Sequence, residues 1–149
     1  MDLNDPLDVM ARTLWGEARS GGAAGMRHVA SVILNRANHP RWWGSDIRGV
    51  CLAPMQFSCW NSDDINRPKL EAVGPDDPWF LIAKVVSAAA IAGNLVDATL
   101  GADSYFAHSM STKPSWAAHA VHTYSAGWHD FYRVELDPPG QSVAVTTDG

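Results

Sequence analysis

The sequence predicts a single, mainly α-helical domain with a small β-hairpin or irregular loop region beside a substrate groove. Two observations favour this class: helical apolar periodicity over residues 6–39, and a second long apolar run after residue 78. With 149 residues, 46% hydrophobic and 18% charged, the chain is long enough to bury a core of its own. We therefore expect one domain over residues 1–149, with its core at about 6–133 and a C-terminal tail at 137–149.

The first helix is predicted to begin at Asp5 and Pro6, an N-cap acid followed by proline at the first helical position. Apolar residues then recur at the i, i+3, i+4, i+7 spacing of one helix face, and the pattern stops at the glycine pair 21–22. The apolar positions are Leu7, Met10, Ala11, Leu14 and Trp15.

A second helix repeats this spacing from Met26 to Ala37 and is predicted to end at the Asn-His-Pro run 38–40. The following segment, residues 41–78, is rich in Gly, Pro, Asn and Asp. It predicts a long irregular segment with a short helical turn at 45–52 and a small hairpin around 55–60. Irregular segments of this length are uncommon in compact domains and are usually functional.

A third helix is predicted to begin at Asp77 and Pro78. The run that follows, WFLIAKVVSAAAIAGNL, is apolar nearly all round apart from Lys84 and Ser87. A helix of that composition is expected to be buried on most faces, so we predict that it is the central helix of the domain. A loop at 101–113 then leads to a short helix at about 114–116.

Composition excludes several classes of function. The net charge is −5 with no Lys or Arg run, which disfavours a nucleic-acid partner. No apolar run reaches the length of a membrane span. The N-terminal MDLNDPLDVM lacks a basic region followed by an apolar core, so we expect no signal peptide and synthesis in the cytoplasm. We also expect a monomer, no cofactor or metal, and free thiols at Cys51 and Cys59.

Seven tryptophans are a heavy aromatic load for this length. Their rings pack cores and also line sites for sugars, and we expect core packing for most of them.

Glu17 lies at the edge of the first helix's apolar stripe, in the last turn before the glycines. Partial burial and the negative end of the helix dipole both disfavour the carboxylate there. A raised pKa suits a general acid working near neutral pH. The alternative, a solvated residue paired with Arg12 or Arg19, is equally compatible with the geometry of the helix.

Two aromatic and polar clusters are further candidates. In PMQFSCWN, residues 54–61, alternation along an extended segment would place Gln56, Ser58 and Trp60 on one face, with Phe57 between them. Amides and hydroxyls beside an aromatic ring suit the hydroxyl and N-acetyl groups of amino sugars. An ordinary turn with a buried Trp explains the pattern comparably well, and the same holds for DSYFAH at 103–108.

The histidines raise the possibility of a metal site. His119 and His122 are three residues apart, and His108 and His129 flank them. No H-E-x-x-H pattern is present, so a metal amidase is a minor alternative. A Ser or Cys nucleophile is disfavoured in the same way, because no nucleophile elbow or cysteine signature occurs.

Four blocks together resemble the SleB-type cell-wall hydrolases, which include spore-cortex-lytic enzymes and phage endolysins. They are ARTLWGEARSGGAAGMRHVASVILNR, PMQFSCWN, GADSYFAHSMSTKPSWA and HDFYR. The resemblance implies a lysozyme-like α+β fold and cleavage of the MurNAc–GlcNAc β-1,4 bond of peptidoglycan. It implies that Glu17 is the catalytic acid and that Gln56 and Tyr105 lie in the groove. We also expect His129 to contact substrate.

The resemblance and the residues together favour a lytic transglycosylase with a single catalytic Glu. A glycosidase of the usual kind needs a second carboxylate. Asp46, Asp63, Asp64 and Asp103 lie in candidate loops, but none of them is an obvious partner for Glu17. In the single-acid route Glu17 protonates the glycosidic oxygen and then deprotonates the MurNAc 6-hydroxyl, closing a 1,6-anhydro ring.

Two alternatives to this enzyme remain open: a hydrolytic muramidase with a second carboxylate, and a non-catalytic peptidoglycan-binding module. The expected setting is a phage endolysin that reaches the wall of a Gram-negative host through membrane holes.

Overall fold

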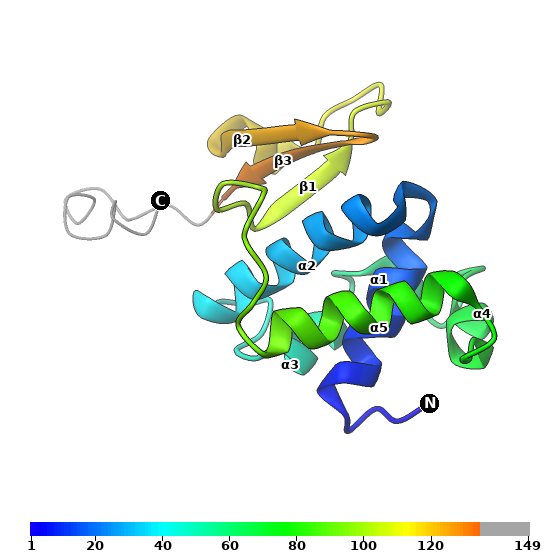
Figure 1. The fold of residues 1–149 in the computed structure, drawn as a ribbon. Coiled ribbons are helices and arrows are strands. Elements are labelled where there is room, and N and C mark those ends of the chain that lie inside the picture. The colour runs from blue at the N-terminus through cyan, green and yellow to red at the C-terminus, as the bar shows by residue number, and fades with distance from the viewer. Residues whose placement is uncertain (135–149) are drawn as a thin grey trace.

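The computed structural model describes residues 1–134, which form a helical bundle with a small sheet on one side (Figure 1). The mainly α class with a small β region is therefore confirmed. The predicted tail at 137–149 lies outside the described residues. The helices are α1 (Pro6–Ala18), α2 (Gly22–Asn38), α3 (Ile47–Leu52), α4 (Arg67–Ala72) and α5 (Pro78–Ile91), with 3₁₀ turns η1 (Arg19–Gly21), η2 (Ser58–Trp60) and η3 (Ser115–His119).

The predicted helix starts at Asp5 and Asp77 agree with the structure, as does the end of the second helix near residue 38. The second helix begins at Gly22, four residues before the predicted Met26, and α1 ends at Ala18, before the glycine pair. The Asp5 carboxylate accepts a hydrogen bond from the backbone N–H of Leu7 at the start of α1. Asp77 caps α5 in the same way through the N–H groups of Trp79 and Phe80. An N-cap carboxylate satisfies backbone donors that have no partner within the helix, which explains why these Asp-Pro pairs mark helix starts.

The sheet is antiparallel, with strand order β1 (Ser104–Ala107), β3 (His129–Arg133), β2 (Val121–Ala126). It lies on one side of α2, with α5 on the other (Figure 1). A small cluster of Val32, Ala102 and Phe131 joins the sheet to α2. The hairpin predicted around residues 55–60 is therefore wrong: the β structure comes later in the chain, and residues 58–60 form the 3₁₀ turn η2.

The central helix is α1, not the predicted α5. Every residue of α1 from Val9 to Trp15 is buried, and α1 packs against α2, α3, α4 and α5. In contrast, α5 lies at the side of the bundle and exposes Trp79, Leu81 and Val85. The prediction failed because apolar composition was taken as a measure of burial, whereas α1 buries polar residues whose hydrogen bonds are satisfied.

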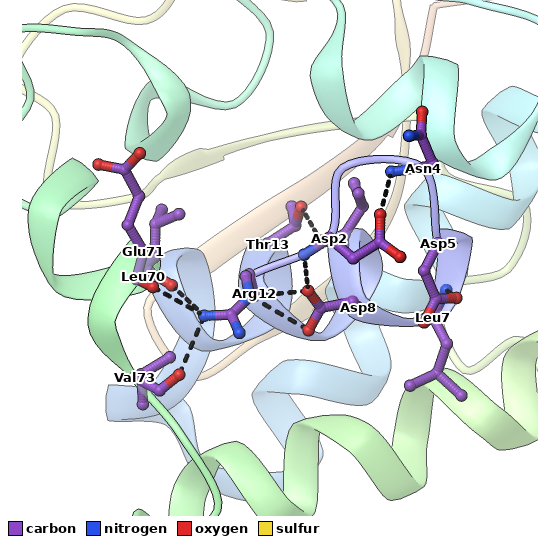
Figure 2. A network of polar contacts seen from close by, with 11 residues as sticks. Asp2, Asn4, Asp5, Leu7, Asp8, Arg12, Thr13, Leu70, Glu71 and Val73 are labelled. Carbon is purple, nitrogen blue, oxygen red and sulfur yellow. Dashed lines mark hydrogen bonds and ion pairs between the residues drawn. The ribbon is translucent and has the colours of Figure 1, made fainter.

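Arg12 is the clearest example of such a satisfied polar residue (Figure 2). Its Nε donates to both oxygens of Asp8 at 3.1 Å, and its Nη1 donates to the backbone carbonyls of Leu70 at 2.6 Å and Val73 at 3.0 Å. These carbonyls lie at the end of α4, where the helix itself supplies no donor. Arg12 thereby attaches α4 to the middle of α1.

The segment at 41–78 is more regular than expected, because it contains α3, η2 and α4.

Among residues 1–134, no helix has the length and apolarity needed to cross a bilayer. Cys51 and Cys59 are both free and buried. Core packing accounts for fewer tryptophans than expected: Trp15, Trp43 and Trp60 are buried, whereas Trp42, Trp79 and Trp128 are exposed.

Candidate active site

Glu17 lies in the last turn of α1, where the helix reaches the edge of the core. The Tyr105 hydroxyl donates a hydrogen bond to Glu17 Oε1 at 3.1 Å. The side chain and backbone of Cys59, from η2, also interact with this carboxyl. Residues from α1, η2 and β1 thus meet at one acid.

Burial raises the pKa of Glu17, the direction that the sequence predicts. The hydrogen bonds from Cys59 and Tyr105 act against this rise because they stabilise the carboxylate, and the charge of Asp64 adds to it. The alternative of a solvated ion pair does not hold. Arg12 is bound to Asp8 and α4, and Arg19 donates to the Trp15 carbonyl and to Asn66.

Tyr105 reaches Glu17 because β1 runs beside α2 and pairs with β3, with Tyr105 opposite Phe131. The Tyr105 ring contacts the ring of His129 edge-on, with centroids 4.8 Å apart. Burial, together with His108 and His28, lowers the pKa of His129, which favours a neutral imidazole at this place. The sequence thus identified a Glu, a Tyr and a His that lie together.

Two hollows flank the Glu17–Tyr105 pair. The first has a volume of about 540 Å³ and includes Tyr105 in its lining; the second has about 420 Å³ and includes Ala18 and His129. Tyr105 lines the first hollow and its ring contacts His129 of the second, so the hydrogen bond between Tyr105 and Glu17 lies beside both hollows, whereas Glu17 itself is in the lining of neither. The first is also lined by Arg36, Trp42, Gln56, Trp116 and His119, and the second by Ser20, Gly21, Gly25, His28 and Trp128.

The predicted residues of the 54–61 cluster are only partly brought to these hollows. Gln56 lines the first hollow. Ser58 is exposed in η2, whereas Phe57 and Trp60 are in the hydrophobic core. Trp60 Nε1 donates to the hydroxyl of Thr13 at 2.9 Å within the protein. The predicted alternation is therefore wrong: the segment turns at η2 and directs its large aromatic residues inward.

The sequence reasoning missed Arg36 and Cys59 as residues of the site. Arg36 is buried, its Nε donates to the Asp103 carbonyl at 2.6 Å, and its Nη1 lies 3.4 Å from Gln56 Oε1. It is the last residue of the block ending VILNR, so a cation at the end of that block was the available signal. Nothing in the sequence pattern distinguished Cys59 from Cys51.

Three of the other candidate carboxylates accept hydrogen bonds from groups other than those of the Glu17 pair. Asp46 accepts from Gly49 N and caps α3. Asp103 is buried and accepts from Val134 N at 2.8 Å and from Ser104 Oγ at 3.1 Å. Asp64 accepts from Asn66 N at 2.7 Å and also acts on Glu17 through its charge. Asp63 is exposed.

The histidine pair predicted as a minor metal site is divided between two elements. His119 lies in η3 and lines the first hollow, whereas His122 lies in β2 with its Nε2 2.7 Å from Ser125 Oγ. Over the described part of the chain, no group of three His, Cys, Asp or Glu side chains is arranged to hold a metal ion.

Comparison with known proteins agrees with the resemblance seen in the sequence. The family model described as Cell Wall Hydrolase matches residues 20–132. A spore cortex-lytic enzyme of Halalkalibacterium halodurans is 31% identical over 83 residues, which cover 50% of this chain but only 25% of that protein. The chain therefore spans about a quarter of the length of that relative.

Two solved structures have the same fold. The catalytic domain of the Bacillus cereus SleB protein matches with a TM-score of 0.67 and 26% identity, over 86% of this chain and 89% of that one. The catalytic domain of the germination-specific lytic transglycosylase SleB from Bacillus anthracis matches with a TM-score of 0.66 and 24% identity, over 86% and 93%. The lysozyme-like α+β fold that the resemblance implied is confirmed.

Proposed function

Because the chain belongs to the Cell Wall Hydrolase family, we propose that it cleaves the glycan strands of peptidoglycan at the MurNAc–GlcNAc β-1,4 bond. The observation that carries this proposal is the partly buried Glu17, which is hydrogen-bonded to Tyr105 in the lining of the first hollow. A glycan strand lying along both hollows would present a glycosidic oxygen to Glu17. A partly buried acid with a raised pKa is the group needed to protonate that oxygen.

The proposed reaction is that of a lytic transglycosylase. Glu17 protonates the glycosidic oxygen as the C1–O bond breaks, and the N-acetyl carbonyl of MurNAc stabilises the positive charge at C1. Glu17, now a carboxylate, removes the proton of the MurNAc 6-hydroxyl, whose oxygen bonds to C1. Glu17 ends the cycle protonated. The reaction therefore needs no second carboxylate and consumes no water.

Three other residues have proposed supporting roles. Tyr105 donates to Glu17 and holds the carboxyl toward the substrate. Gln56 lines the first hollow, where its amide suits an N-acetyl group. His129 lines the second hollow beside Tyr105 and would contact the sugar on that side.

The decisive variant is Glu17→Gln, which keeps the size of the side chain and removes the acid. We expect the release of soluble fragments from purified sacculi to fall by about 10²–10⁴-fold, the usual contribution of a general acid. Glu71→Gln on α4 is the matched control, because Glu71 is exposed and pairs with Arg67. Equal rates for Glu17→Gln and wild type would refute the proposal, and binding to sacculi without release by wild type would indicate a glycan-binding module.

A hydrolytic muramidase is the second candidate, favoured by the charge of Asp64 acting on Glu17. Mass spectrometry of the released muropeptides separates the two reactions. We expect the products to carry 1,6-anhydro-MurNAc ends. Reducing MurNAc ends would instead show hydrolysis, and if Asp64→Asn no longer released them, Asp64 would be the second carboxylate.

The endolysin role in a Gram-negative host remains a prediction. Its test is expression in such a host with and without a membrane-hole-forming partner: lysis that requires the partner supports the role, and failure to lyse with the partner present contradicts it.

A further inference from the structure

Cys59 is a buried residue beside Glu17 that the proposed mechanism does not use. It is fully buried in η2, and its side chain and backbone both interact with the Glu17 carboxyl. Glu17 therefore has two side-chain partners from different elements, the hydroxyl of Tyr105 and the thiol of Cys59.

The close approach of η2 to α1 depends on Gly16. A Cβ added to Gly16 would lie 3.0 Å from both Cβ and Sγ of Cys59 and 3.3 Å from Cδ2 of Leu70. A side chain at this position of α1 would make contacts tighter than van der Waals packing allows, so Cys59 would have to shift away. The residue next to the proposed acid thus sets the place of the thiol.

The ionisation state of Cys59 makes it a donor. Burial and the neighbouring Glu17 carboxyl raise the pKa of this thiol. It is therefore a neutral S–H group over the whole pH range in which Glu17 titrates. A thiol in that state donates to a carboxylate, whereas a thiolate would repel it.

We propose that Cys59 is a positioning residue, which donates its S–H to Glu17 and with Tyr105 fixes the orientation of the carboxyl. This inference rests on the proposed function. The remaining charged groups near Glu17 are Asp64, which opposes its ionisation, and Arg36 of α2, whose buried guanidinium interacts with Glu17 at longer range. Arg19 is directed to Asn66 and the carbonyls of α1.

The test compares Cys59→Ser and Cys59→Ala with wild type. A hydroxyl donates more strongly than a thiol, and alanine does not donate. We expect the pKa of Glu17 to be lowest in Cys59→Ser, higher in wild type and highest in Cys59→Ala, and the alkaline limb of kcat/KM to move to higher pH in the same order. We also expect Cys59→Ala to lower kcat about fivefold at unchanged KM, the loss of one ordinary hydrogen bond.

Cys51 supplies the matched control. It is equally buried, but its side chain hydrogen-bonds Thr13, and burial raises its pKa to about 12. Cys51→Ala and Cys51→Ser should leave the titration of Glu17 unchanged. The same order of shifts in the Cys51 variants would show a general effect of altered packing in the core and would overturn the proposal.

The titration of Glu17 is measured directly by carbon NMR of protein labelled at the glutamate carboxyls, with the resonance assigned through Glu17→Gln. This reading does not depend on catalysis. An inactive wild type refutes the proposed function but still leaves the order of pKa values measurable. If the enzyme is active but the pKa of Glu17 is the same in wild type, Cys59→Ser and Cys59→Ala, the role of Cys59 is refuted and the proposed function is not. If Cys59→Ser does not fold, the comparison of Cys59→Ala with wild type decides.

Discussion

At the scale of single residues, Glu17 is subject to opposing influences on its ionisation. Burial removes water from the carboxylate and raises its pKa, whereas the donors on Tyr105 and Cys59 stabilise the charged form. The result is an acid with a raised pKa that is held in place by hydrogen bonds. A general acid needs both properties, since it must keep its proton until the substrate is bound and must lie in line with the leaving oxygen.

This arrangement predicts a cost in stability that depends on pH. The folded state of an acid with a raised pKa binds its proton more tightly than the unfolded state. Stability is therefore lost as pH rises from the ordinary value of 4.5 through the folded-state pKa of Glu17.

We expect Glu17→Gln to have a higher melting temperature than wild type at pH 7, with the difference disappearing below pH 4.5. Thermal unfolding followed by circular dichroism at a series of pH values measures it. Glu71→Gln, which removes a glutamate from the exposed face of α4, serves as the control for the substitution itself. A difference independent of pH would contradict the argument.

At the scale of elements, the site depends on how closely α1 is approached by its neighbours. Gly16 lets η2 contact α1, and Arg12 attaches the end of α4 to the same helix (Figure 2). The stretch of chain from η2 to the end of α4 is thus attached to α1 at both ends, and it includes Cys59 and Asp64. The two groups that act on Glu17 from this segment are thus placed by the packing of short helices rather than by a long loop.

Gly16→Ala should disturb this packing. The added methyl would lie 3.0 Å from Cys59, so η2 or α1 must move. We expect a loss of about 1–3 kcal/mol in the free energy of unfolding. In Gly74→Ala the added methyl meets nothing within 4 Å, so a change within about 0.5 kcal/mol is expected. Urea unfolding measures both, and equal effects would show that the contact with Cys59 is not limiting.

At the scale of the whole molecule, the groove is formed by parts of the chain that are far apart in sequence. Its two hollows take residues from α1, α2, the 54–61 segment, η3 and the sheet. The exposed Trp42 lies in one hollow and the exposed Trp128 in the other. The proposed glycan strand would therefore meet an aromatic ring on each side of Glu17, a surface suited to sugar rings.

Trp128→Ala should weaken glycan binding without altering the chemistry. Trp128 is 67% exposed and lines the second hollow, whereas Trp79 is exposed on α5 and lines neither hollow. We expect a roughly tenfold rise in KM, or about 1.4 kcal/mol, with kcat retained. Trp79→Ala should change neither constant. Steady-state kinetics on solubilised glycan strands measures the effect, and a fall in kcat at constant KM would contradict it.

Local signals in the sequence predicted the helices well. Capping at Asp5 and Asp77 and the periodicity of the first two helices depend on neighbours in the chain, so they can be read without the fold. Burial could not be read in this way. The apolar α5 has an exposed side, and α1 buries Arg12 and Thr13, because position in the bundle decides which faces are covered.

The amino-acid sequence was sufficient to identify the family, the two opening helices, and Glu17 as a partly buried acid at a helix end. The residues that surround this acid were set by tertiary contacts, which brought Tyr105 and Cys59 to Glu17 and directed Phe57 and Trp60 into the core. Glu17 and Tyr105 are 88 residues apart in the chain, and they meet only because the sheet packs on α2. Contacts of that kind leave no periodic signal in the sequence.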